Sequence, residues 1–473
     1  MSKNKKFLFI IVLLLAGKVE AQNTYTLRAC IDTAIKNNLQ VNQAGYVADG
    51  SLIDLQQAKA LALPGVSANI SHGENLGRSI DPFTNTYKDQ RLLFAGYNLN
   101  AGITLWNGSS IRNNKQSAAL LADASKQDWE QSKNLVTINV ILAYLQVLSA
   151  DEQLSASIQR RDLTKQQVDR LEVLQQNGAT QPGIYYDLKA QLSSDEMNVI
   201  DGKTNVENAK ILLAQWMNID YDPALLLEKV EQEILPLAYE ADRELIFNTA
   251  AANLALMKAA VLRQQSAEKN IAAIKGSLLP TISLNGSLGT NISSAASTLN
   301  FVSSSDVPSG DYVLVDGVKN DVITNNSVFA EEKIGYFNQW KNNFNTQVGI
   351  SIQIPILNGL QIRSQLKRAQ LAKQRIETEN KATKTQLRQT IDQAYINRHA
   401  AMDRYVQMTD QVNALTESYR IATVRFETGA INSVEYLTAK NNMENAIVNR
   451  ISGRYDYILR SHVLDFYMGK MGF

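Results

Sequence analysis

The sequence predicts a mainly α-helical chain whose strands contribute to a transmembrane β-barrel, and three observations carry this prediction. Residue pairs in the two halves of the chain recur at a spacing of 251 positions, which indicates a tandem repeat. Each half contains segments in which apolar and polar residues alternate strictly, the pattern of a strand with one apolar face. Each half also contains a long proline-free segment of helical composition.

The N-terminus resembles a secretory signal peptide. Lys3, Lys5 and Lys6 precede an apolar run over residues 7–17, and a small residue, Ala21, precedes the expected cleavage point. The run is too short to span a bilayer comfortably, which argues against the alternative of an uncleaved anchor. We therefore expect residues 1–21 to be removed and the mature chain to be exported.

Composition excludes several classes of function. The chain has 47 basic and 46 acidic residues, and removal of the signal segment, which holds four Lys and one Glu, leaves 43 and 45, too balanced for a nucleic-acid footprint. Cys30 is the only cysteine and the three histidines lie far apart, so neither a disulfide within the chain nor a metal site is expected. We find no catalytic triad, P-loop or dinucleotide fingerprint, and expect neither an enzyme nor a cofactor.

The repeat defines the predicted domains. We expect a first repeat over residues 22–218, an inter-repeat linker over 219–241 and a second repeat over 242–473, each with a lead-in helix, a strand pair and a long helical hairpin. The period is far too long for a solenoid. The recurring pairs include Asn107-Gly108 and Asn358-Gly359, Ile111-Arg112 and Ile362-Arg363, Ala143-Tyr144 and Ala394-Tyr395, Gly178-Ala179 and Gly429-Ala430, and Leu213 and Leu464.

The strands follow the lead-in helices, which end before Pro64 and Pro280 because proline disfavours helix at the preceding residue. The clearest alternation covers residues 97–105 and 348–356, about the length of a tilted membrane strand. A half-buried soluble sandwich would give the same pattern. No other run reaches the ~18 apolar residues of a membrane helix, which favours the barrel. Four strands cannot enclose a channel, so several copies must assemble, and three would supply twelve strands.

The long helices are predicted over residues 109–177 and 360–428, each about 100 Å if fully helical. They indicate either an ordinary coiled coil or a wall of helices around a tunnel. A glycine follows each, and a second helix of roughly 35 residues runs back. Pro182-Gly183 predicts a first turn about two residues longer than the second. Residues 291–340 are rich in Ser, Asn, Gly and Asp and predict a long surface loop.

Strand pairs, helical hairpins and tandem duplication together resemble the TolC-type outer membrane efflux protein family. The strongest local match is residues 426–429 followed by 434–439, with residues 178 and 187–190 as its repeat partner. The resemblance implies a homotrimer with a twelve-stranded β-barrel in the outer membrane lipid, its loop 291–340 extracellular, and a twelve-helix α-barrel in the periplasm. It also implies a passive exit channel of a tripartite efflux or type I secretion system. A periplasmic adaptor and an inner-membrane pump would be the partners.

The resemblance further implies a gate and docking tips at the ends of the hairpins. Glu435 takes the place of an acidic ring at the narrow periplasmic mouth, with Thr438 at a second ring that is not acidic here. Asp187 fits the Asp of a Tyr–Arg–Asp lock, but Phe426 and Ile431 replace the Tyr and the Arg. Phe426 is therefore expected to form an apolar latch or to pack in the helix seam. The implied adaptor-docking tips are Gly178, Ala179, Gly429 and Ala430.

The competing hypothesis is a periplasmic coiled-coil scaffold or an adaptor protein. An adaptor normally needs one helical hairpin flanked by compact β domains. This chain has two hairpins and only two strand pairs, which favours the channel.

Overall fold

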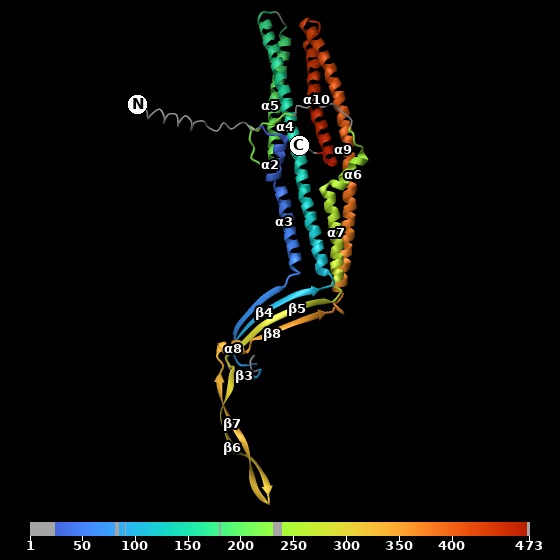
Figure 1. The fold of residues 1–473 in the computed structure, drawn as a ribbon. Coiled ribbons are helices and arrows are strands. Elements are labelled where there is room, and N and C mark those ends of the chain that lie inside the picture. The colour runs from blue at the N-terminus through green and yellow to red at the C-terminus, as the bar shows by residue number, and fades with distance from the viewer. Residues whose placement is uncertain (1–23, 81–84, 90, 179–180, 230–238, 471–473) are drawn as a thin grey trace, which may run out of the picture. The chain divides into compact units, whose positions relative to one another are not determined.

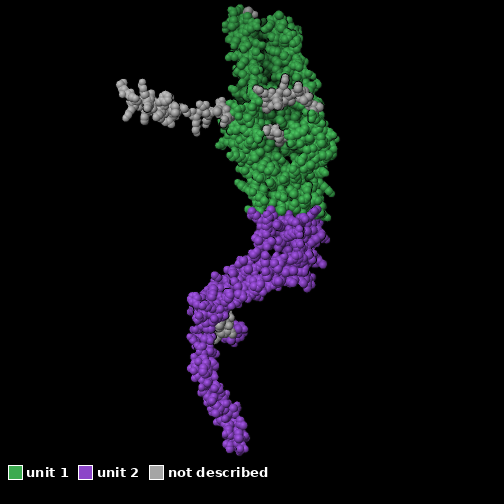
Figure 2. Space-filling model, viewed as in Figure 1, with its two compact units in different colours: residues 1–54, 118–267, 372–473 green, residues 55–117, 268–371 purple. Residues whose placement is uncertain are grey.

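The computed structural model describes residues 24–80, 85–89, 91–178, 181–229 and 239–470 (Figure 1). Two compact units are present, the first formed by residues 1–54, 118–267 and 372–473, the second by residues 55–117 and 268–371 (Figure 2). Each unit takes segments from both repeats, so the repeat boundaries predicted from the sequence describe the duplication and not the compact units. The predicted signal peptide, residues 1–21, lies outside the described part of the chain.

Both halves of the chain fold into the same series of elements. The first comprises α2 (Leu27–Asn37), α3 (Leu39–Ala60), β1 (Gly65–Asn75), β4 (Leu92–Trp106), α4 (Ser110–Gln176) and α5 (Pro182–Met217). The second comprises α6 (Arg243–Asn253), α7 (Ala255–Gly276), β5 (Thr281–Ser293), β8 (Asn345–Gln353), α9 (Gln361–Glu427) and α10 (Ser433–Met468). The remaining elements are β2 (Arg78–Ile80), β3 (Tyr87–Asp89), β6 (Ser297–Val315), β7 (Val318–Lys333) and α8 (Tyr336–Asn342).

The two helical hairpins are identical in length. α4 and α9 have 67 residues each and α5 and α10 have 36 each, with every boundary displaced by 251 positions. The prediction that Pro182-Gly183 lengthens the first turn is therefore wrong, because a proline at the first position of a helix costs no hydrogen bond and α5 begins on it.

The backbone conformation repeats at the same spacing of 251 positions as the sequence. Left-handed φ values occur at four pairs of positions 251 apart, and two of these four pairs contain a residue other than glycine. A residue with φ > 0 is uncommon outside glycine, so this coincidence is a strong mark of duplication. The pairs are Gly108 and Gly359, Ser109 and Leu360, Gly178 and Gly429, and Asn218 and Gly469.

Each lead-in is two helices instead of the single helix that the composition predicts. The breaks fall at Asn38 and Leu254, which both leave the helical region of φ/ψ space. The first helices begin on equivalent caps 216 positions apart, where the side chains of Thr26 and Asp242 accept hydrogen bonds from the amides of Ala29 and Leu245.

The strands form one antiparallel sheet in the order β1-β4-β5-β8. The register brings the apolar residues of all four strands to one face and leaves Ser, Asn, Gln, Thr and Gly on the other, as the alternation predicts. The exposed apolar face includes Val66, Ile70, Leu99, Leu284, Leu288, Val348, Ile350 and Ile352. β8 ends at Gln353, so Ile354 and Ile356, predicted as strand residues, lie beyond it.

Residues 291–340 are mostly regular structure, and the predicted surface loop is wrong in that respect. β5 continues to Ser293, β6 and β7 form a separate two-stranded antiparallel ribbon, and α8 leads into β8. The Ser- and Asn-rich composition led to the prediction of a loop. A ribbon exposed to solvent on both faces needs no apolar stripe, so its strands have no alternating pattern in the sequence. The ribbon is almost entirely exposed along both strands.

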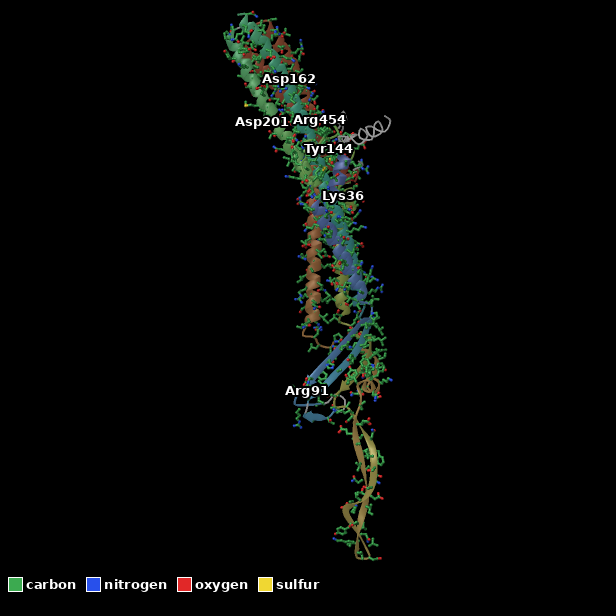
Figure 3. All side chains as sticks on the ribbon, turned by 90° about the vertical axis from the view of Figure 1, so that its left-hand side faces the viewer. Lys36, Arg91, Tyr144, Asp162, Asp201 and Arg454 are labelled. Carbon is green, nitrogen blue, oxygen red and sulfur yellow. The ribbon has the colours of Figure 1, made fainter. Side chains whose placement is uncertain are left out.

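The largest buried cluster gathers residues of α2, α3, α4, α5 and α10. Tyr144, labelled in Figure 3, lies fully buried in it and donates a hydrogen bond of 2.7 Å to the carbonyl oxygen of Glu228. One stretch of α4 is long and apolar enough to cross a membrane by composition, contrary to the sequence prediction. Val136, Val140 and Ile141 of α4 belong to this cluster, and 44% of the apolar stretch is buried, so burial against neighbouring helices contributes to the apolarity of α4.

Candidate gate at the tips of the helical hairpins

The tips are built by glycine-dependent helix ends. Gly429 has φ = +74°, and its amide donates to the carbonyl oxygen of Phe426 while the amide of Ala430 donates to that of Arg425. This pair of bonds is the Schellman motif, which satisfies the last carbonyls of a helix and requires a left-handed residue. Gly178, with φ = +68°, ends α4 in the equivalent place. Ala179, predicted as a docking residue, lies outside the described residues.

A groove of about 850 Å³ separates the two tips and is lined by residues of α4, α5, α9 and α10. Asp187 of α5 lies in this groove, where its Oδ2 accepts a hydrogen bond of 2.7 Å from Ser433 Oγ at the start of α10. The structure therefore brings the predicted lock residue Asp187 against the second hairpin. The partner of Asp187 is Ser433, and not Phe426 or Ile431, which take the places of the Tyr and Arg of the family's lock.

Phe426 packs inside the chain. Its ring stacks on Tyr436 of α10 at a centroid distance of 4.6 Å, beside the buried cluster of Val168, Tyr185 and Leu188. This is the helix-seam packing that the sequence analysis offered as one role of Phe426.

Tyr436 joins the two hairpins. Its hydroxyl lies 2.9 Å from that of Tyr419 and accepts a hydrogen bond from Gln167 of α4. Burial raises the pKa of Tyr436 well above its ordinary value, so the hydroxyl stays protonated and remains available as a donor.

Glu435 and Thr438 lie on the exposed side of the first turns of α10. The amide of Glu435 donates to the side chain of Asn432, which caps the helix, and Thr438 Oγ1 donates to the carbonyl oxygen of Val434. A carboxylate in the first turn is favoured by the helix dipole. Among the described residues, neither side chain forms a hydrogen bond or ion pair with the first hairpin, whereas Asp187 bonds to Ser433 and Phe426 packs beside the cluster of α4 and α5 residues.

Two helical turns from the tip, a buried group of charges connects three helices. Lys440 of α10 is 1% exposed and its Nζ lies 3.1 Å from Oδ2 of Asp195 on α5, which is 0% exposed. On α4, Thr164 Oγ1 donates to Asp195 at 2.5 Å, and Arg160 Nε lies 2.5 Å from Oε2 of Glu444. Two cations and two carboxylates balance, which is the arrangement that permits burial of charge.

The pKa of Glu444 is raised, chiefly because burial penalises the carboxylate, while Lys440 and Arg160 oppose the shift. Sequence reasoning missed this group entirely, since Lys440 and its repeat counterpart Lys189 look alike in a helical pattern and only Lys440 is buried. A weak signal existed: Asp195 has Ala446 at the equivalent place, so this charge is specific to one repeat.

Further along the hairpins, Glu152 of α4 pairs with Arg454 of α10, which Figure 3 labels. Polar contacts between the hairpins thus recur at three levels, at the tip, at the buried charges and at Arg454. Among the described residues, no group of three or more His, Cys, Asp or Glu side chains is placed to hold a metal ion.

The chain matches the family model "Outer membrane efflux protein" over residues 246–470. The outer membrane protein TolC of Escherichia coli is 22% identical over 480 residues, covering 96% of this chain and 84% of TolC. TolC of Salmonella enteritidis is also 22% identical, covering 99% of this chain and 87% of its own length.

Solved structures share the fold. The CmeC outer membrane channel of Campylobacter jejuni superimposes with a TM-score of 0.71 at 18% identity, covering 94% of this chain and 85% of CmeC. The outer membrane protein VceC of Vibrio cholerae gives 0.71 at 16% identity, covering 93% of this chain and 94% of VceC. The family model lies in the second repeat, and the relatives and structures extend the likeness over nearly the whole chain. The second repeat therefore matches the outer membrane efflux protein family, and the chain as a whole is similar to TolC in sequence and to outer membrane channels in fold.

Proposed function

We propose that this chain is the outer membrane exit channel of a tripartite efflux or type I secretion system, and that it acts as a homotrimer. Its location is the outer membrane of a Gram-negative-type cell, with the helices in the periplasm. The chain would be a passive conduit, because an inner-membrane pump supplies the energy and a periplasmic adaptor links the two.

The four-stranded sheet is the observation that carries this proposal. Most of both faces is exposed, one being apolar and the other lined by uncharged polar side chains. Lipid would cover the apolar face and water the polar face, as in outer membrane barrels. The sheet also has two open edges, β1 and β8, and open edges are not tolerated in a bilayer. Three copies would join these edges into twelve strands, wide enough for a pore.

The hairpin tips would serve both as gate and as docking site. Glu435 projects from the first turn of α10 on an exposed surface, and three copies would set three carboxylates around one axis, an arrangement that favours cations. The contact of Asp187 with Ser433 would hold the two hairpins of one copy together at the mouth. Gly178, Gly429 and Ala430 are exposed at the tips and would meet the adaptor.

The test is to purify the mature chain in detergent, measure its mass and record its conductance in a planar bilayer. We expect a trimer that gives discrete, cation-preferring steps. A non-conducting monomer or dimer would contradict the proposal and favour a coiled-coil scaffold. A silent trimer would be repeated with Phe426→Ala, which removes the stacking on Tyr436; a trimer that stays silent then also contradicts the channel.

A further inference from the structure

The pairing of strands within each repeat is the same. β1 pairs with β4 such that Gly65 faces Gly102, and β5 pairs with β8 such that Thr281 faces Gln353. These partners are related by the two offsets of the repeat, 216 positions for the first strand and 251 for the second. The repeats are therefore equivalent in hydrogen-bond register as well as in sequence.

A third pairing, between β4 and β5, joins the two repeats. In it Asn100 faces Ser287 and Ala101 faces Gly286. In the equivalent pairing, β8, the second strand of the second repeat, would pair with β1, the first strand of the first repeat. This pairing is absent within one chain, because β1 and β8 are the two edges of the sheet. Only the β1 strand of another copy can supply it.

Resting on the proposed trimer, we propose that the seam between copies repeats the register of the β4–β5 seam. β8 would then pair with β1 so that Ser351 faces Ser71 of the partner subunit and Ile352 faces Ile70 of the partner subunit. The same offsets set Gln353 against Asn69 of the partner subunit.

The chemistry of the two strands agrees with this register. Ser351 and Ser71 both lie on the polar face, and Ile352 and Ile70 both lie on the apolar face, where they are 62% and 72% exposed in the single chain. A shift by one residue would set every polar side chain against an apolar one, because side chains alternate along a strand. A shift by two residues would still set polar side chains against polar ones and apolar against apolar. The choice between these registers therefore rests on the equivalence with the β4–β5 seam.

The proposed seam also accounts for the early end of β8. β4, its counterpart, is paired with β1 only as far as Gly102 and continues to Trp106 through its pairing with β5, whereas β8 is paired only with β5 and ends at Gln353, the equivalent of Gly102. Next to a partner subunit, β8 would extend through Ile354 toward Leu357, the equivalent of Trp106. Gly359, just before α9, gives the same indication. A Cβ atom at its counterpart Gly108 would contact the carbonyl oxygen of Gly276, whereas a Cβ atom at Gly359 would lie in open space.

Cysteine cross-linking in the full-length channel tests the register. Ser351→Cys with Ser71→Cys should give covalent dimers and trimers on oxidation, because directly opposite residues are within disulfide reach. The matched control is Asn100→Cys with Ser287→Cys, the equivalent pair within one chain, which should form an intrachain disulfide with comparable yield. Cys30 is buried and should not interfere.

Shifted pairs decide the outcome. Ser351→Cys with Asn69→Cys, and Ser351→Cys with Gly73→Cys, should cross-link several-fold less than the pair with Ser71. A higher yield from either shifted pair would overturn the register. Absence of all three cross-links in a preparation that is trimeric by mass, with the intrachain control intact, would overturn the β1–β8 seam but leave the trimer. A monomeric preparation would overturn the proposed function itself.

Discussion

Lys440→Met should destabilise the fold more than the same change at any surface lysine of these helices. Lys440 and Asp195 are both almost fully inaccessible and lie 3.1 Å apart, so loss of the ammonium group leaves a buried carboxylate whose remaining cation, Arg160, is 4.0 Å away. Breaking one partner of a buried ion pair costs about 3–5 kcal/mol. A cost of that size shifts the folding equilibrium by roughly two to four powers of ten.

The assay is denaturant unfolding of the purified channel, followed by its helical circular dichroism signal. Lys189→Met is the matched control, because Lys189 occupies the equivalent position of the first repeat but is exposed. Its effect should stay within about 0.5 kcal/mol, as for most surface substitutions. The double variant Asp195→Leu/Lys440→Met should recover most of the loss, because apolar replacement of a whole buried pair is often neutral.

Two results would refute this reasoning. Equal effects of Lys440→Met and Lys189→Met on the free energy of unfolding would mean that the buried lysine stabilises the fold no more than the surface lysine does. A double variant as unstable as the sum of its two single variants would mean that Lys440 and Asp195 act independently, against the 3.1 Å contact.

Three further predictions concern the mouth, the ribbon and the tips. Glu435→Gln should shift the reversal potential toward lower cation preference in a planar bilayer, and an unchanged potential would exclude the acidic ring. Deletion of residues 297–333, the β6–β7 ribbon, should spare the trimer by mass, because Ile334 donates to Ala296 at 3.0 Å and the ends are already adjacent; loss of the trimer would make the ribbon structural. Gly429→Glu should abolish export in cells with the trimer intact, since the left-handed turn and the tip surface are both disturbed, and normal export would argue against docking there.

Period and repetition in the sequence correctly predicted the two faces of the sheet and the long helices. The alternation in residues 97–105 and 348–356 correctly separated the two faces of the sheet, and the proline-free segments correctly predicted α4 and α9. These patterns are set locally, by burial of one side of an element, and they survive in a single chain. The two hairpins are equal in length, as the offset of 251 positions requires, but Pro182-Gly183 led to the wrong prediction of a longer first turn.

The contacts between hairpins could not be predicted in the same way. Ser433 was missed as the partner of Asp187 because two residues 246 positions apart are brought together only by tertiary packing. Tyr436 and Lys440 were missed because a polar residue on a helix is usually solvated, and burial of these two depends on which face α10 turns toward α4 and α5. The ribbon was taken for a loop because its strands lack a buried side.

The open edges of the sheet have a kinetic consequence. A single copy that entered the membrane alone would expose the unpaired backbone amides and carbonyls of β1 and β8 to hydrocarbon, at a cost of several kcal/mol for each group. Insertion before association is therefore the unfavourable order of events. The rate at which chains enter a bilayer should rise more steeply than in proportion to their concentration, and chains kept dilute should remain outside the membrane as a pool prone to edge-to-edge aggregation.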